Sequence, residues 1–238
     1  ADARQVVFEV SPDEFDSPDV AMQTLQLARF ENGAQLSAVL PDATRAALDA
    51  ALRARGASLA QLDPFEPWFV TLSLVMELAQ SAGFRGDDGL DQHLMRKARA
   101  AGKPVAGLET VQSQLLALDS TPMHEQIAGL AELIERPAEM QAAVEGLHAA
   151  WRAGDAVKLE ALSRSEMQAK TPETYRIINV ERNRAWLPQL RGMLDGPDTD
   201  DVLVVVGAMH LLGPDGLVEQ LRGNGYRIER ICDACAGR

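Results

Sequence analysis

The sequence has little of what would assign a function class at once. Its 238 residues include two cysteines, and aromatic residues make up 5% of the chain. The longest apolar run, Trp68 to Met76, is far shorter than the about 20 residues that a helix needs to cross a bilayer. The net charge is −12 and no block of Lys and Arg stands out. We therefore expect no transmembrane segment and no nucleic-acid partner, because nucleic-acid binding needs a basic face.

Several common catalytic motifs are also missing. The chain has no G-x-S-x-G, no H-E-x-x-H, no P-loop and no G-x-G-x-x-G, so the usual hydrolase, zincin and nucleotide-binding classes are not indicated. Cys232 and Cys235 form a lone C-x2-C without the second ligand pair of a structural zinc site. This spacing is typical of an exposed tail dithiol or a small-loop disulfide.

The order of predicted elements indicates the fold class. β-Branched segments predict four strands, over 4–10, 103–109, 201–206 and 226–231. Helical spacing predicts helices over 18–30, 43–55, 67–81, 90–101 and 215–222, and nearly throughout 110–195. Strands separated by helices favour an α/β fold with a small, largely parallel central sheet and a large helical insertion. We expect one domain, 1–238, with 110–195 as a helical elaboration within it.

Three local features carry specific expectations. Asp42 and Asp215 each stand where a carboxylate caps the helix that follows. Gly56 and Gly102 stand where glycine ends a helix. The helix predicted over 67–81 is apolar on almost every side, which predicts that it is buried.

Chemistry-bearing side chains stand at the ends of three predicted strands. Glu9 lies near the end of the first strand, Glu109 ends the second, and His210 follows the third. Ligands bind outside the carboxyl ends of strands in open α/β sheets. Two carboxylates and an imidazole suit a divalent metal, or acid–base work on a bound water. The alternative is that each is an ordinary surface charge or the neighbour of a helix cap.

Other residues bear on whether these strand ends form a functional site. Gly207, between the third strand and His210, allows a close backbone approach or a positive φ. In the helical run ERNRAW, Arg182 and Trp186 share a face and Asn183 lies beside them. An arginine fork binds carboxylate or phosphate, but a solvated charge run with Trp186 as a core anchor is the alternative. Three other histidines have no ligand partner at helical spacing and are predicted at the surface: His93, His124 and His148.

Several motifs, taken in order along the chain, resemble the TraB/PrgY/GumN family, which includes the Tiki proteins. Residues 204–228, VVVGAMHLLGPDGLVEQLRGNGYRI, resemble its C-terminal signature of a strand, a G-x-x-H motif, a Gly-Pro-Asp-Gly turn, a helix and a strand. Earlier motifs are resembled by VVFEV, PWFVTLSL, GLDQHLMRKARAAGKPVAGLET and ERNRAWLPQL. The resemblance covers essentially the whole chain.

The resemblance implies both a fold and a chemistry. The family is grouped with ChaN-like and erythromycin-esterase-like α/β proteins, and Tiki members are described as metal-dependent proteases supported by manganese or cobalt. Carried onto this sequence, it implies that Glu9, Glu109 and His210 bind a divalent metal. The implied site residues together are Glu9, Glu109, Arg182, Asn183, Gly207 and His210.

One family motif is missing from this chain. A first G-x-x-H normally precedes the VVFEV strand, and the sequence has none. The resemblance therefore implies that the chain is a fragment or has lost half of the site. A sheet without that strand has an unpaired edge, which favours a homodimer.

Two functions follow from the resemblance. The first is a metal-dependent hydrolase, with a peptide or small-molecule substrate. The second is a non-catalytic peptide-binding protein, because TraB and PrgY members are associated with the shutdown of peptide-pheromone signalling. GumN-like proteins often carry a signal peptide or lipoprotein leader, which implies a periplasmic or exported bacterial protein.

Overall fold

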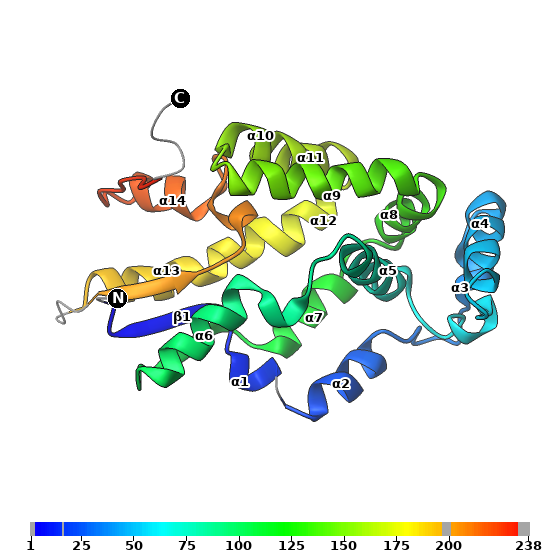
Figure 1. Cartoon of the computed structure of the whole chain (residues 1–238), viewed down its shortest axis with the longest axis horizontal. Helices are drawn as coiled ribbons and strands as arrows, with labels where there is room; N and C mark the ends of the chain where they lie inside the picture. Colours follow the sequence, from blue (N-terminus) through cyan, green and yellow to red (C-terminus); the bar gives the residue numbers. More distant parts are fainter. Residues whose placement is uncertain (1–2, 16, 197–200, 233–238) are drawn as a thin grey trace.

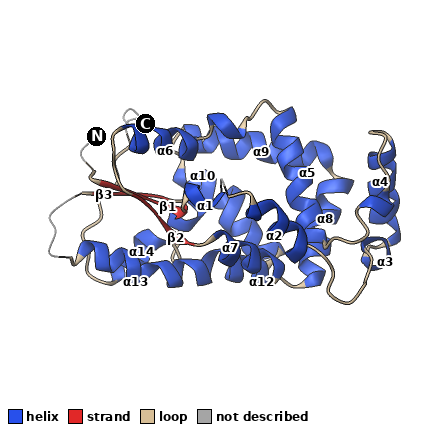
Figure 2. Cartoon of the chain, turned by 90° about the horizontal axis from the view of Figure 1, so that it is seen from below, coloured by secondary structure: helices blue, strands red, loops and turns tan. Residues whose placement is uncertain are grey.

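The computed structural model describes residues 3–15, 17–196 and 201–232. Its sheet consists of three parallel strands, β1 (Gln5–Val10), β2 (Val105–Glu109) and β3 (Val202–Val205), in the order β2-β1-β3. Figure 2 shows these strands at one end of the molecule, with helices making up the rest. The predicted α/β class with a small parallel sheet and a large helical part is confirmed.

Most helices follow the predicted pattern (Figure 1). Before β2 they are α1 (Pro12–Phe15), α2 (Asp19–Leu27), α3 (Leu36–Val39), α4 (Asp42–Arg53), α5 (Pro67–Ser81) and α6 (Leu90–Ala100). Between β2 and β3 they are α7 (Val111–Asp119), α8 (Met123–Glu135), α9 (Pro137–Arg152), α10 (Ala156–Glu160), α11 (Glu166–Lys170), α12 (Pro172–Tyr175) and α13 (Arg182–Leu194), and α14 (Leu217–Gly223) follows β3.

Two π-helical segments and three 3₁₀ turns complete the description. The π-helical segments are η3 (Ala161–Ser165), between α10 and α11, and η4 (Arg176–Glu181), between α12 and α13. The chain is therefore helical without a gap from α12 through η4 to α13. The 3₁₀ turns are η1 (Leu59–Gln61), η2 (Gly86–Asp88) and η5 (Ala208–Leu211).

Apolar packing covers both faces of the sheet. On one face, Val7 and Leu108 pack with Trp186 of α13 and Leu217 of α14. On the other face, strand residues pack with Met95 and Ala98 of α6, and those strand residues are Val6 and Phe8. A separate core, away from the sheet, joins α3, α4, α5 and α8. Burial on both faces fixes the strands, and with them the positions of the side chains at the strand ends.

The predicted glycine stops are confirmed, but both predicted caps are wrong. Gly56 and Gly102 have φ values of 75° and 65°, the left-handed conformation in which glycine ends a helix. The residue that caps α4 is Pro41, and Asp42 is the first helical residue. The residue that caps α14 is Gly216. The Asp215 carboxylate makes no capping bond to α14 and accepts a hydrogen bond from the Tyr175 hydroxyl.

The prediction that the helix over 67–81 is buried all round is also wrong. The buried residues of α5 are Pro67, Trp68 and Val70, all in its first turns. Met76 is 55% exposed, and Leu72 and Val75 are each 39% exposed. The helix packs mainly on α8 and joins the core with α3 and α4, but the side that carries Leu72, Val75 and Met76 faces solvent in the described structure. An apolar sequence shows that burial is favourable, but packing decides whether it occurs.

The strand predicted over 226–231 is not formed. These residues have no strand assignment, and Ile231 is 85% exposed. A strand exists only when a neighbour completes its backbone hydrogen bonds, and β1 pairs with β2 and β3 alone among the described residues. This segment therefore has no pairing partner in the described sheet.

No helix of the described residues combines the length and apolar character that crossing a membrane requires. Cys232 is not a free thiol. Cys235 lies outside the described residues.

Candidate functional site

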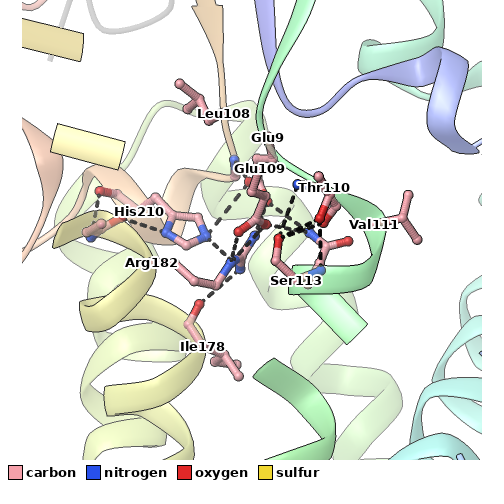
Figure 3. A network of polar contacts seen from close by, with 12 residues as sticks. Glu9, Leu108, Glu109, Thr110, Val111, Ser113, Ile178, Arg182 and His210 are labelled. Atoms are coloured by element: carbon pink, nitrogen blue, oxygen red, sulfur yellow. Dashed lines mark hydrogen bonds and ion pairs between the residues drawn. The ribbon is translucent and has the colours of Figure 1, made fainter. Parts of the chain in front are cut away.

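The side chains predicted at the strand ends meet in one place. Glu9 comes from β1 and Glu109 from β2, while His210 lies in η5, directly after β3. The register places Glu109 beside Val10, the residue that follows Glu9, so both carboxylates stand at the carboxyl end of the β1–β2 pair. Figure 3 shows these three side chains directed toward Arg182, the first residue of α13. The sequence prediction that these groups share one edge of the sheet agrees with this geometry.

The Arg182 guanidinium is the centre of the cluster. Its Nη2 donates to Glu9 Oε2 at 2.7 Å and to Glu109 Oε1 at 2.6 Å. Its Nε donates to Glu109 Oε1 and Oε2 at 3.1 and 3.3 Å. Its Nη1 donates to the Ile178 carbonyl at 2.9 Å and faces His210 Nε2 at 3.2 Å. All five N–H groups of an arginine are therefore engaged within the protein.

Both carboxylates accept further hydrogen bonds. The Gly207 amide donates to Glu9 Oε1 at 2.6 Å. The Gln114 side chain lies at 3.5 Å from Glu9 Oε2 and 3.4 Å from Glu109 Oε1. Side-chain exposure is 23% for Glu9, 14% for Arg182 and 10% for Glu109. The cluster is thus largely buried, and Glu9 is its most accessible carboxylate.

Gly207 owes its place to close approach and not to an unusual backbone. Its φ is −56°, so the alternative of a positive φ is wrong. A Cβ at this position would lie 3.1 Å from Glu9 Oε1 and 3.7 Å from His210 Cδ2. Glycine lets the loop after β3 come near enough for its amide to bind Glu9.

Asn183 fixes the orientation of the His210 ring. The Asn183 Nδ2 donates to the backbone carbonyls of His210 and Asp215, at 3.3 and 2.9 Å. Its Oδ1, which can only accept, lies 2.7 Å from His210 Nδ1, so Nδ1 carries the proton. The lone pair of His210 Nε2 is then directed toward Arg182 and toward Glu9 Oε1, 3.8 Å away.

His210 is kept neutral by its surroundings. Burial lowers the pKa of its imidazole from 6.5 to about 4, and the Arg182 charge acts in the same direction. The nearby Glu9 carboxylate opposes the shift without cancelling it. A neutral imidazole whose Nε2 is an acceptor, here facing the Arg182 guanidinium, is suited to bind a cation or to accept a proton.

The stability of the protein should record this shift. Because the folded state disfavours protonated His210, the contribution of His210 to the free energy of unfolding is fully present above pH 6.5. It is lost as the pH drops from 6.5 toward 4. Chemical denaturation of wild type and His210→Gln at pH 7 and pH 5 checks this. We expect the wild type to lose more stability than the variant, and equal losses would contradict the assignment.

The ring of Trp186 packs against both Arg182 and His210. The Arg182 guanidinium carbon lies 4.8 Å from the centroid of the Trp186 ring, a cation–π contact. The Trp186 and His210 rings are 4.5 Å apart, centroid to centroid. Trp186 is also 1% exposed. The two alternatives for ERNRAW are therefore combined, because Trp186 is a core anchor and Arg182 belongs to the site.

A second polar network fixes the loop that carries His210. Arg164 is 8% exposed, and its Nε donates to the Tyr175 hydroxyl at 3.1 Å. Its Nη2 and the Tyr175 hydroxyl both donate to Asp215 Oδ2, at 3.4 and 3.2 Å. Gly213, with φ of 70°, passes so close that a Cβ would lie 2.3 Å from Arg164 Nε. The helical part of the chain thus anchors the loop from both sides.

Sequence reasoning missed three residues of this region. Gln114 stands on α7, the helix that Thr110 caps directly after β2, and no pattern in the sequence singles it out. Asp91 lies in the first turn of α6, and both burial and the charge of Glu9 raise the pKa of its carboxyl. Arg164 lies 51 residues from its partner Asp215, and no local pattern reveals such a pair. The three histidines predicted at the surface are exposed: His93, His124 and His148.

The types of side chain in the cluster suit a divalent cation, but their arrangement does not form a complete metal site. Two carboxylates and a neutral imidazole are common ligands, and Asn183 orients the imidazole as outer partners of metal-bound histidines do. Yet within the described ranges no three or more His, Cys, Asp or Glu side chains are arranged to hold a metal ion. The place where Glu9, Glu109 and His210 converge holds the Arg182 guanidinium.

Comparison with known proteins agrees with the resemblance seen in the motifs. The profile of the TraB/PrgY/gumN family matches residues 1–230. No curated protein matches the chain, and no solved structure does. The family match covers all the residues of the cluster.

Proposed function

Because the chain belongs to the TraB/PrgY/gumN family, we propose that it is a hydrolase that depends on a divalent cation and acts on a peptide or another small acyl substrate. One observation carries the proposal. Acceptor groups from the ends of all three strands, on Glu9, Glu109 and His210, converge on a single cationic group. Three acceptor groups that converge in this way can also bind a divalent cation.

The residues would divide the work as follows. Glu9 and His210, whose Oε1 and Nε2 atoms are 3.8 Å apart, would hold the cation. Glu109 would join them if its carboxylate were not bound to Arg182. Asn183 would keep the His210 proton on Nδ1. Manganese or cobalt is the cation proposed, and when bound it supplies an activated water and polarises a substrate carbonyl.

Thermal unfolding with manganese, cobalt, zinc and calcium tests the proposal. A cation in hundredfold excess over its dissociation constant stabilises the protein by about 2.7 kcal/mol. We expect manganese or cobalt to stabilise the wild type and a His124→Ala control, whose histidine is exposed on α8, but not His210→Ala. If no cation stabilises the wild type, the cation-dependent mechanism is wrong.

A groove beside the cluster favours a second candidate, a peptide-binding protein without catalysis. The groove has a volume of about 510 Å³ and is lined by β3, α13 and α14. Its apolar lining includes Leu211, the neighbour of His210, and Leu217. A peptide binder of this kind should keep its affinity in a folded His210→Ala variant, whereas the hydrolase should lose its activity.

A further inference from the structure

The positive group at the centre of the cluster is the guanidinium of Arg182. Arg182 contributes one positive charge, Glu9 and Glu109 contribute two negative charges, and His210 faces the guanidinium with the acceptor Nε2 of its ring. The cluster therefore keeps a net negative charge even with the guanidinium in place. Electrostatics thus still favours a second cation here, but the guanidinium occupies the lone pairs that such a cation would use.

We propose that Arg182 is a tethered competitor for the cation site, and that a divalent cation binds by displacing its guanidinium from Glu9 and His210. This inference rests on the proposed function and adds a means of regulation to it. Bound Arg182 would keep the site closed, and its displacement would free a guanidinium to meet an anionic group of the substrate.

The contacts indicate which bonds must break and which can stay. The bonds that compete are those from Nη2 to Glu9 Oε2 and from Nη1 to His210 Nε2, the second being long at 3.2 Å. The other oxygen of Glu9, Oε1, accepts from the Gly207 amide, whereas Arg182 binds Oε2. Glu9 is also the most exposed member of the cluster, at 23%. A cation arriving from solvent would therefore meet Glu9 first.

The Trp186 ring lies next to the guanidinium that would be displaced. The guanidinium rests on the face of Trp186, 4.8 Å from the ring centroid, and that ring is in turn 4.5 Å from the ring of His210. Any movement of Arg182 therefore changes the electrostatic environment of the Trp186 indole. This contact provides a readout that does not depend on catalysis.

Titration calorimetry with manganese chloride at neutral pH tests the competition. The proteins are wild type, Arg182→Lys, which keeps a positive charge, and Arg182→Met, which removes it at similar length. We expect Arg182→Met to bind manganese at least tenfold more tightly than wild type, and Arg182→Lys to stay within threefold of wild type. If Arg182→Met binds no more tightly than wild type, the competition is refuted and the proposed function can still hold.

A second pair of proteins covers the case in which Arg182→Met does not fold without a cation. Glu109→Gln and Glu109→Gln/Arg182→Met differ only in the guanidinium. In the double variant, position 109 on β2 carries no charge that needs an arginine partner. We expect tenfold tighter manganese binding by the double variant than by Glu109→Gln. If none of the five proteins binds manganese, both the competition and the cation-dependent function are wrong.

Tryptophan fluorescence gives an independent measurement of the displacement. Zinc chloride is the probe, because zinc does not quench emission as paramagnetic manganese does. We expect zinc binding to change the emission of wild type but not that of Trp186→Phe. Zinc binding seen by calorimetry without a change in wild-type emission would show that the guanidinium stays in place, and would overturn the inference.

Discussion

Replacement of Arg182 by methionine is expected to lower the free energy of unfolding by about 3–5 kcal/mol, the usual result of removing one partner from a buried ion pair. The guanidinium binds both Glu9 and Glu109, and the side chain of Glu109 is only 10% exposed. Without Arg182, two carboxylates face each other in a poorly solvated place. Urea denaturation at neutral pH measures the loss.

The cost should come mainly from the unpaired charge. Glu109→Gln in the Arg182→Met background removes that charge at nearly constant volume, so the double variant should recover at least half of the lost stability. Glu9 keeps its bond from the Gly207 amide in both variants. If the double variant is no more stable than Arg182→Met, lost packing on Trp186 explains the effect better than charge does.

Gly213→Ala is expected to cost about 2–4 kcal/mol. A residue with a side chain pays about 1 kcal/mol or more for the left-handed conformation that Gly213 adopts at φ 70°. Overpacking adds about 1–3 kcal/mol, because the new Cβ would lie 2.3 Å from Arg164 Nε. The loop that carries His210 must then shift, or Arg164 must leave Tyr175 and Asp215.

Gly225→Ala is the matched control for this substitution. Gly225 has φ of 91°, and a Cβ there would have no atom within 4 Å. It should therefore cost only the conformational penalty, about 1 kcal/mol. Chemical denaturation of both variants separates the two contributions. Equal losses would mean that the contact between Gly213 and Arg164 contributes nothing to stability.

The sequence predicted those parts of the fold that depend on local chemistry. β-Branched runs located β1 and β3, and glycines marked the ends of α4 and α6. It failed where a distant neighbour decides the outcome. Residues 226–231 are predicted as a strand but have no pairing partner among the described strands. The apolar sequence of α5 does not reveal that one side of it lacks a covering element.

The same distinction applies to the site. The strand ends placed Glu9, Glu109 and His210 together, since parallel strands bring their carboxyl ends to one edge. The role of Arg182 was harder to foresee, because it depends on how α13 crosses the sheet and not on the motif ERN itself. Spacing gave the types of groups that meet, whereas the three-dimensional packing determined that a guanidinium stands at their centre.

The π-helical segment η4 ends immediately before Arg182. A π-helical turn contains about one residue more than an α-helical turn, so it alters the angular phase of every residue that follows. Loss of one residue from η4 would rotate α13 by about 100° relative to α12. Arg182 and Asn183 would then point away from His210 although their own sequence is unchanged. For this protein, the length of a helix preceding the site is as strict a requirement as the identity of the residues within it.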